Sequence, residues 1–527
     1  MTATGSVGQR VRVTGHDAGA GLPGRTIFDG LAGLTARAPW CWPTLLTLAF
    51  GFYQVGRPEL WRDELASWSF ATRPLPSLMA AAHRSGATQL AYYLALHVWI
   101  AAFGDSVDTM RALSVLAMAA AAACVTLIGR RLAGTRAGLI SGLVFALVPS
   151  VSRFAQEVRF YALAVFAATL ATLLLLRALD RPSARRWVAY ALCLALLGYI
   201  DVVALSVVVG HAGGVALRWR RDRDAGAAWF APAAAAGLAA CLPLVVVGVT
   251  QQGGQIDWVP RPGLSFFTLS FFARNLLYST SVAAALIVLA VLALAAAWRE
   301  AAFMTAVAVL PVAAVWLISE GPHSYFFPRY LLMTVAAWAV VVGIGLSRLN
   351  VRAAAAAVAV VAVLGAGDQQ VVREPGAHNW STYPVGSGGY YPGFAEAAAV
   401  IARQARAGDG AVYQGDGNAA GWMMTGYGIQ YYLSQDLRHG VPAPRELFIA
   451  EPPAKAGVLY ARPCKQMAAC LGGEQRIWVV GDTRNLSKIL APGQAAVLRQ
   501  RGYRLSHATD VPGLTVFLLV RDKASAR

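Results

Sequence analysis

The chain has 527 residues, of which 57% are hydrophobic and only 14% are charged. Soluble domains are typically about 45–50% apolar and about 25% charged, so the composition excludes an ordinary soluble protein and indicates a polytopic membrane protein. A net charge of +18 could suggest a nucleic-acid partner. The arginines, however, fall in short clusters between apolar segments, as in the cytoplasmic loops of membrane proteins, so we expect no nucleic acid.

The N-terminal segment, residues 1–38, is rich in Gly and Arg and predicts a disordered cytoplasmic tail. The first apolar run starts too late for a cleavable signal peptide and has no clear cleavage site of small residues.

A transmembrane domain is predicted for residues 39–367, because about 20 apolar residues span a bilayer. Eleven candidate spans follow one another along this region: 40–58, 110–129, 135–151, 159–178, 186–200, 202–218, 227–249, 280–297, 302–319, 329–346 and 353–367. With the N-terminus inside, every Arg cluster between these spans faces the cytoplasm, as the positive-inside rule requires. The first outer loop is then residues 59–109, and the C-terminal region 368–527 is extracytoplasmic.

Residues 88–103 are apolar and helical in pattern, but they are short and contain Tyr, His and Trp, which suit a helix lying at the membrane interface. Counting them as a span would place all the later Arg clusters outside. We therefore interpret them as part of the first outer loop.

The region 368–527 changes character, because short apolar runs alternate with helical patterns at 394–407 and 488–501. This alternation predicts an α/β domain. It contains no nucleotide-binding glycine motif. Cys464 and Cys470 are expected to form a disulfide if the domain lies outside the cytosol.

Two adjacent carboxylates, Asp63 and Glu64, lie between Trp61 and Trp68 in the first outer loop. A carboxylate at the bilayer edge is suited to take the proton of an acceptor hydroxyl as a new bond forms. The alternative is a solvated acidic pair neutralised by Arg62, with the tryptophans in an ordinary interfacial belt.

Two further outer loops carry unexpected charges. Residues 152–161 hold Arg153, Glu157 and Arg159 between two spans, where charges tend to be functional, although an ion pair at the interface is an alternative. Arg329 opens an otherwise apolar span, and its guanidinium is a candidate phosphate clamp. A guanidinium that extends to the interface is the alternative interpretation.

Five motifs occur in order along residues 40–335: Asp63-Glu64, 90–99, 103–105 with 111–114, 157–163 and 328–332. On these motifs the chain resembles the GT-C superfamily of membrane glycosyltransferases. It is most similar to the family 39 type, which includes the protein O-mannosyltransferases and the lipid A aminoarabinose transferase. The chain departs from the family at 88–91, where members often carry Pro-Pro.

The resemblance implies the GT-C fold, a polyprenyl-phosphate sugar donor, inverting transfer and an acidic base in the first outer loop. We therefore predict a hexosyltransferase of the cell membrane, with a mannose-like sugar and a cell-envelope glycan, lipid or protein as acceptor. Asp63 is the predicted base, with Glu64 beside it. The predicted substrate-binding residues are Arg62, Tyr93, His97, Glu157, Arg159, Tyr161, Arg329 and Tyr330.

Glu64 and Glu157 are also candidates to hold a divalent cation between them, and no other cofactor is expected. Two alternatives belong to other classes: a lipid-sugar transporter or flippase, and a non-catalytic glycan-binding membrane protein. A transporter would place polar residues at the middle of its spans. Here the polar groups collect at the outer ends, which favours an enzyme acting at the outer face.

Overall fold

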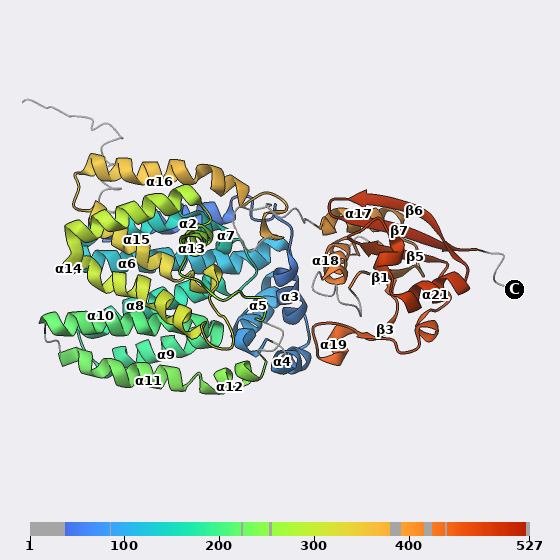
Figure 1. The fold of residues 1–527 in the computed structure, drawn as a ribbon, viewed down its shortest axis with the longest axis horizontal. Helices are drawn as coiled ribbons and strands as arrows, with labels where there is room; N and C mark the ends of the chain where they lie inside the picture. The colour runs from blue at the N-terminus through green and yellow to red at the C-terminus, as the bar shows by residue number, and fades with distance from the viewer. Residues whose placement is uncertain are drawn as a thin grey trace, which may run out of the picture.

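The computed structural model describes residues 37–522 except 85, 223–224, 252–255, 380–391, 416–423 and 438–439. Nearly all of the predicted N-terminal tail, residues 1–38, lies outside the described residues. A helical bundle and a sheet-containing C-terminal domain lie end to end along the long axis of the molecule (Figure 1). This architecture confirms the predicted fold class.

All eleven predicted spans fall on helices of the bundle. The helices are α2 (Cys41–Phe52), α6 (Val107–Leu147), α7 (Pro149–Ala155), α8 (Tyr161–Asp180), α9 (Ala184–Ile200), α10 (Val207–Asp222), α11 (Phe230–Ala239), α12 (Leu242–Thr250), α13 (Phe266–Leu277), α14 (Thr280–Ile318), α15 (Thr334–Leu346) and α16 (Val351–Val371). Within the described residues, four of them (α6, α8, α14 and α16) are long and apolar enough to cross a membrane alone. The bent pair of α11 and α12 would make a fifth. The predicted number of eleven crossings therefore stays a prediction.

The long helix α6 contains two of the predicted spans, because its backbone breaks at Ala133 and Gly134. Gly134 has φ +90°, in the left-handed region that favours glycine. The two halves then pack closely against each other: a Cβ at Gly138 would lie only 2.4 Å from the carbonyl oxygen of Thr126. The small residue permits a tight helical hairpin at the turn that carries the first Arg cluster. Helix α14 likewise breaks at Ala297, between two predicted spans.

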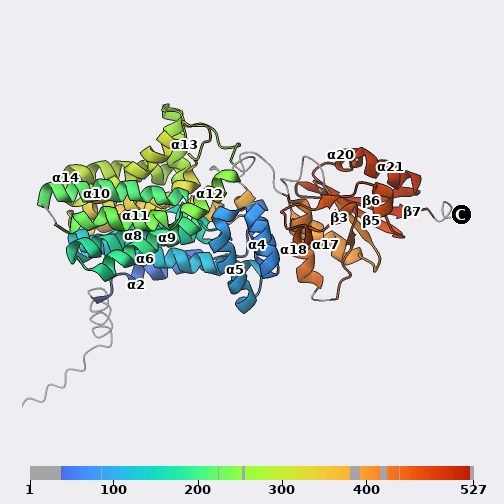
Figure 2. The same cartoon turned by 90° about the horizontal axis from the view of Figure 1, so that it is seen from below.

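The first outer loop forms three helices, α3 (Arg62–Ala71), α4 (Leu75–Arg84) and α5 (Leu90–Phe103). They lie at the end of the bundle that faces the C-terminal domain (Figure 2). Helix α5 has 14 residues. At 1.5 Å per residue it is about 21 Å long, shorter than the ~30 Å hydrocarbon core. It packs against α3, α6 and α9, which supports its interpretation as part of the loop.

The C-terminal domain contains a five-stranded sheet in the order β2-β1-β5-β7-β6 among the described residues. Its strands are β1 (Gly410–Tyr413), β2 (Arg445–Glu446), β5 (Arg476–Gly481), β6 (Tyr503–Val511) and β7 (Leu514–Arg521), and β3 (Ile449–Glu451) and β4 (Arg462–Pro463) form a separate pair. Strands β2, β1 and β5 are parallel, whereas β7 runs antiparallel to both β5 and β6.

Helices cover both faces of this sheet: α17 (Phe394–Gln404) and α18 (Thr425–Leu437) on one, and α20 (Leu486–Ile489) and α21 (Pro492–Gln500) on the other. The α/β arrangement is as predicted, but the prediction of a single helix over 488–501 was wrong. Pro492 begins α21 after an extended residue, so the helical pattern divides into two helices.

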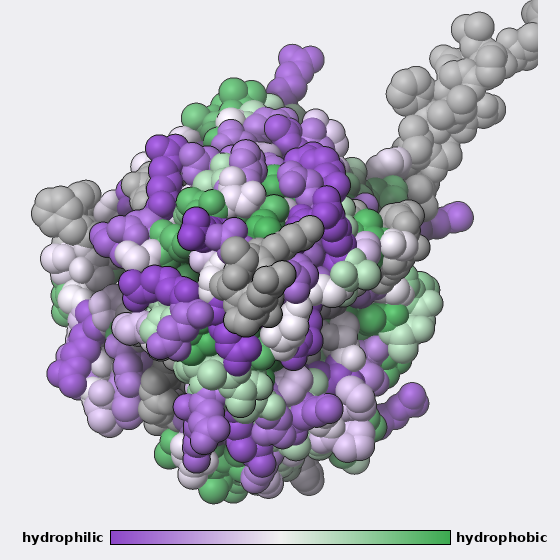
Figure 3. All heavy atoms as spheres, turned by 90° about the vertical axis from the view of Figure 1, so that its right-hand side faces the viewer, coloured by the Kyte–Doolittle hydropathy of each residue, from purple (hydrophilic) through white to green (hydrophobic). Residues whose placement is uncertain are grey.

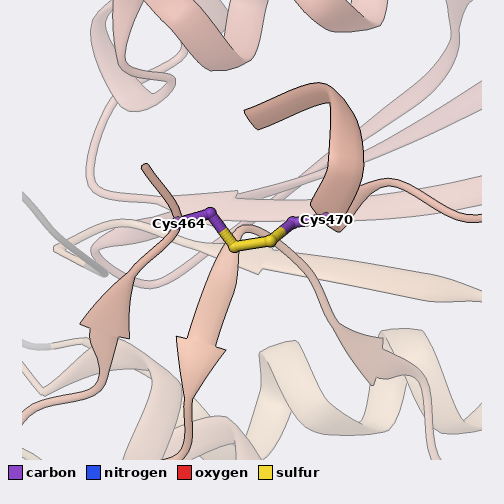
Figure 4. The surroundings of a disulfide bond; sticks show 2 residues. All are labelled: Cys464 and Cys470. Carbon is purple, nitrogen blue, oxygen red and sulfur yellow. A yellow bond between two sulfur atoms is a disulfide. The ribbon is translucent and has the colours of Figure 1, made fainter. Parts of the chain in front are cut away.

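The end of the C-terminal domain that faces away from the bundle is largely covered by hydrophilic side chains (Figure 3). In the same domain Cys464 and Cys470 are joined as a disulfide (Figure 4). Cys464 follows β4, and Cys470 ends the short helix η7 (Met467–Cys470).

Candidate active site

The acidic pair lies in the first turn of α3, where negative side chains favour the positive end of the helix dipole. Trp61 precedes the helix with an extended backbone, and its N–H donates to Glu64 Oε2 at 3.3 Å. Successive residues of a helix point about 100° apart. Asp63 and Glu64 therefore face different surroundings although they are neighbours in the sequence.

Glu64 is fully buried and both of its oxygens accept hydrogen bonds from the protein. Arg111 donates through Nε at 3.0 Å and through Nη2 at 2.9 Å, and the Val158 N–H donates at 2.8 Å. Burial would raise the pKa of Glu64, but Arg111 overcomes this effect and the pKa is lowered. Glu64 thus joins α3 to α6 and to the loop before α8, with no oxygen left for a substrate.

Arg111 is itself fully committed to this junction. Its Nη1 donates to the carbonyl oxygens of Val55 and Pro58, both at 2.7 Å, and its Nη2 lies 3.3 Å from Nδ1 of His378. Burial, together with Arg153 and Arg111, lowers the pKa of His378 well below its ordinary value. The neutral ring accepts the hydrogen bond from Arg111.

A second buried pair lies next to the first. The Trp61 indole N–H donates to Glu157 Oε1 at 2.9 Å, and Arg153 Nη1 lies 3.1 Å from Glu157 Oε2. Burial raises the pKa of Glu157, although Arg153 opposes the shift. Glu157 Oε1 therefore accepts a hydrogen bond, whereas Oε2 is ion-paired with Arg153 without hydrogen-bond geometry. Within the described part of the chain, no group of three or more His, Cys, Asp or Glu is arranged to hold a metal ion.

Asp63 differs from these buried carboxylates because 21% of its side chain is exposed. Two guanidiniums lie near its oxygens without a close hydrogen bond: Arg62 Nε at 3.6 Å from Oδ1 and Arg329 Nη1 at 3.6 Å from Oδ2. Burial would raise the pKa of Asp63, but Arg159, Arg329 and Arg62 together lower it. Asp63 is thus an ionised carboxylate that a small group can reach.

Arg329 lies in the short helix η4 (Pro328–Leu331) and is only 6% exposed. Five aromatic rings lie with their centroids 5.3–5.8 Å from its guanidinium carbon: Trp61, Tyr161, Trp258, Phe327 and Tyr330. We call this set the aromatic box. The Nε and Nη1 atoms of Arg329 have no hydrogen-bond acceptor among the described residues. Since a buried charge is costly unless paired, this arrangement is suited to an anion with several acceptor oxygens.

Arg159 provides a second cation near Asp63. Its Nη1 lies 3.4 Å from both the Asp63 carbonyl oxygen and Ser67 Oγ, and its Nε has no hydrogen-bond acceptor in the described residues. Two buried guanidiniums with unused donors therefore lie near one accessible carboxylate.

The structure brings most of the predicted site residues together. Tyr161 and Tyr330 belong to the aromatic box, and Arg62 lies beside Asp63. His97 has a different position: its Nδ1 contacts the Ala71 carbonyl oxygen at 2.7 Å, about two helical turns beyond Asp63. This contact fastens α5 to the C-terminal end of α3.

Tyr93 also lies between these two helices. Its ring stacks on Phe70 with centroids 4.6 Å apart, and its hydroxyl donates to Gln89 at 2.6 Å. Asp201, at the C-terminal end of α9, accepts a hydrogen bond at Oδ1 from the Val203 N–H at 2.9 Å.

Sequence reasoning assigned no role to Arg111, His378 or Trp258. Arg111 had a visible signal, since it is a charge in the first turn of a predicted span. Trp258 lies in a turn and His378 in the one-turn helix η5 (Ala377–Asn379). No sequence pattern marks the contact of Trp258 with Arg329 or that of His378 with Arg111.

Comparisons with known proteins bear on the fold and the class of the protein. Residues 89–246 match the family model described as dolichyl-phosphate-mannose-protein mannosyltransferase. No curated protein matches the chain in sequence. The chain is similar to the crystal structure of ArnT from Cupriavidus metallidurans bound to undecaprenyl phosphate, with TM-score 0.58, 13% identity and coverage of 94% of this chain and 99% of that one. For the apo state of ArnT the TM-score is 0.56 and the identity 13%, with coverage of 96% and 99% respectively.

The fold is therefore that of the GT-C membrane proteins. The resemblance to GT-C glycosyltransferases of the family 39 type, stated from the sequence motifs, is confirmed by the family match over part of the bundle together with the shared fold. These matches support a membrane glycosyltransferase.

Proposed function

We propose that the protein transfers a mannose-like sugar from a polyprenyl phosphate to an acceptor hydroxyl at the outer face of the cell membrane, with inversion at the anomeric carbon. The observation that carries this proposal is the position of Asp63, an accessible carboxylate close to the buried guanidiniums of Arg329 and Arg159. Such a transfer needs a base and a phosphate-binding site close to each other. Asp63 would supply the base, and Arg329 and Arg159 would bind the phosphate.

The donor phosphate would bind to the unused N–H groups of Arg329 and Arg159. Guanidiniums bind phosphate oxygens through charge-assisted hydrogen bonds and remain charged when removed from water. The aromatic box excludes water around Arg329 and fixes the direction of its guanidinium. The N–H groups are therefore oriented before the polyprenyl-phosphate sugar binds. The same contacts would stabilise the negative charge that develops on the phosphate as it leaves.

In the chemical step the acceptor oxygen attacks the anomeric carbon, its proton passes to the Asp63 carboxylate, and the bond from carbon to the phosphate oxygen breaks with its electron pair. Phosphate is a good leaving group, so the step requires no general acid. The bound phosphate would offset the positive charge of Arg329 and Arg159. Since these arginines lower the pKa of Asp63, donor binding strengthens Asp63 as a base.

Glu64 has a positioning role in this proposal. Its bidentate pair with Arg111 and its bond from Val158 fix the first turn of α3, which carries Asp63. Glu157 holds the indole of Trp61, which is part of the aromatic box. Because Glu64 is hydrogen-bonded at both oxygens and Glu157 is held by Trp61 and the charge of Arg153, we place no divalent cation in the mechanism.

An outer-face site is supported by the arrangement of the predicted cytoplasmic loops. Asp180, at the end of α8, pairs with Arg131 at the turn of α6 and with Arg218 near the end of α10. Three predicted cytoplasmic loops thus meet in one place, as a common membrane face requires. Asp63 belongs to the loop helices at the end of the bundle that faces the C-terminal domain (Figure 2), and we propose that this domain is extracytoplasmic.

The test is to incubate the purified protein with a panel of polyprenyl-phosphate sugars and to analyse the lipid and the acceptor by mass spectrometry. The proposal predicts release of polyprenyl phosphate together with a glycosylated product. An intact donor under all conditions, with movement of the donor across a vesicle membrane, would instead identify a transporter.

A further inference from the structure

Residues 59–61, directly before α3, are buried where the helical bundle meets the C-terminal domain. The last of them, Trp61, is held by the bundle, because its indole N–H donates to Glu157 at 2.9 Å. The first two are held by the C-terminal domain instead. Asp63 follows in the first turn of α3, so a shift of this segment would move the proposed base.

Glu59 caps helix α17 of the C-terminal domain. Its Oε2 accepts from the backbone N–H groups of Phe394 at 3.0 Å and Ala395 at 3.4 Å, the first two residues of that helix. A carboxylate in this place satisfies N–H groups that have no partner within the helix, and the helix dipole favours its charge. The Glu59 N–H also donates to the carbonyl oxygen of Pro375, in the connection between α16 and α17, at 3.1 Å. Glu59 is therefore tied to the domain by its side chain and to the connection by its backbone.

Helix α18 contacts the chain on both sides of Asp63, at the end of the C-terminal domain that faces the bundle (Figure 1). Before Asp63, the Leu60 N–H donates to the Tyr432 hydroxyl at 3.0 Å. Because Leu60 is fully buried, this N–H depends on a protein acceptor. After Asp63, the ring of Trp68 packs edge-on against Tyr431 with centroids 5.2 Å apart. The short helix that carries the proposed base is thus held by the domain before and after Asp63.

The arginines proposed to bind the donor phosphate are carried by other segments. Arg329 lies in η4, and Arg159 lies in the short segment between α7 and α8. Both segments belong to the bundle. The C-terminal domain therefore contacts the segment that carries the proposed base, whereas the bundle carries the phosphate-binding groups, and the two parts of the site can be perturbed separately.

We propose that the C-terminal domain positions the base, and that Glu59 and Tyr432 are the positioning residues. This inference rests on the transferase activity proposed above and gives the C-terminal domain a part in it. Through Glu59 and Leu60 the domain fixes the entry of the chain into α3, and through Trp68 it fixes the helix itself. The Asp63 carboxylate is thereby kept where it can take the proton of the acceptor hydroxyl.

The test compares variants of the full chain in lipid nanodiscs, with polyprenyl-phosphate mannose as donor and a cell-envelope extract as acceptor. Tyr432→Phe keeps the ring but removes the hydroxyl that accepts from the Leu60 N–H. A displacement of about 1 Å at a reacting group can cost about a hundredfold in rate, so kcat is expected to fall about ten- to a hundredfold. The KM for the donor should change by less than about twofold, because a residue that acts only on the geometry of the transition state leaves ground-state binding intact.

A second pair of variants separates positioning from the mere presence of a side chain. Glu59→Ala should lower kcat in the same way, whereas Glu59→Gln keeps an oxygen that can accept from the Phe394 N–H and should recover most of the lost kcat. The matched control is Tyr503→Phe, which should keep the wild-type kcat. Tyr503 is also buried, but its hydroxyl donates to the carbonyl oxygen of Glu474 within the domain, on the face of the sheet that α21 covers.

A wild-type kcat in both Tyr432→Phe and Glu59→Ala would overturn the inference. An equal loss of kcat in the Tyr503→Phe control, or a donor KM that rises in proportion to the loss of kcat, would also overturn it, because either result would indicate general destabilisation. These outcomes differ from a failure of the proposed function, in which the wild-type protein releases no polyprenyl phosphate, and which would refute the inference as well.

Discussion

Arg329 offers a sharp test of the donor site, because its unused N–H groups distinguish a binding residue from a structural one. Replacing Arg329 by Met keeps a long side chain in the aromatic box but removes two donors, Nε and Nη1, that have no acceptor in the described residues. Hydrogen bonds to a charged group contribute about 1.5–3 kcal/mol each. Two of them at the lower end give about 3–4 kcal/mol, or two to three orders of magnitude in Kd.

The same variant should destabilise the fold only slightly, because Nε and Nη1 make no hydrogen bond in the free protein and the substitution removes only the cation–π contacts and the ion pair with Asp63. Binding of a polyprenyl phosphate to protein in nanodiscs, followed by calorimetry, measures the Kd, and thermal unfolding of the same samples measures stability. Arg348→Ala is the control, since Arg348 is half exposed and pairs with Glu300 away from the site. A Kd for Arg329→Met equal to that of the wild type would refute the assignment.

Three further predictions concern the pair of carboxylates and the disulfide. The pKa of Asp63 in the free protein lies below its ordinary value of 3.8, so the carboxylate stays ionised at pH 5. We therefore expect the same kcat/KM at pH 5 and pH 7. A pH profile of kcat/KM that falls on the acidic side with a midpoint above pH 5 would contradict this. The acidic fall in the pH profile of kcat should lie at higher pH than that of kcat/KM, because the bound phosphate offsets the charge of the neighbouring arginines and raises the pKa of Asp63. Arg111→Ala leaves Glu64 buried without its partner, so the free energy of unfolding should fall by about 3–5 kcal/mol. Thermal or denaturant unfolding would measure it, and an unchanged midpoint would show that the Glu64–Arg111 pair does not stabilise the fold. Cys464 and Cys470 should resist a thiol reagent until a reductant is added, and full labelling without reductant would refute the disulfide.

The helical bundle was predictable because membrane helices are specified locally, by apolar runs of sufficient length and by Arg clusters between them. The eleven predicted segments all became helices for this reason. The C-terminal domain was less predictable. Strand β6 (Tyr503–Val511) carries mostly exposed side chains at the edge of the sheet, so it has no alternation of apolar and polar residues that would reveal it.

The site was predictable as a set of residues but not as a division of roles. Asp63 and Glu64 are adjacent, and nothing in the sequence indicates which one meets Arg111 and which one meets Arg329. That distinction comes from pairs distant in the chain, such as Glu64 with Arg111, and from the direction of each side chain around α3. The unused donors of Arg329 likewise depend on the packing of η4, and sequence spacing does not specify it.

The most direct test of the proposed mechanism is the turnover of Asp63→Asn. The substitution keeps the size of the side chain and removes the proton acceptor, so donor binding at Arg329 should be retained while transfer is lost. Polyprenyl phosphate released from a polyprenyl-phosphate mannose donor, quantified by mass spectrometry, gives the turnover. The mechanism predicts donor affinity at least equal to that of the wild type, because a negative charge beside the phosphate is removed, with release reduced to the background of a protein-free sample. Release near the wild-type rate would show that Asp63 is not the base.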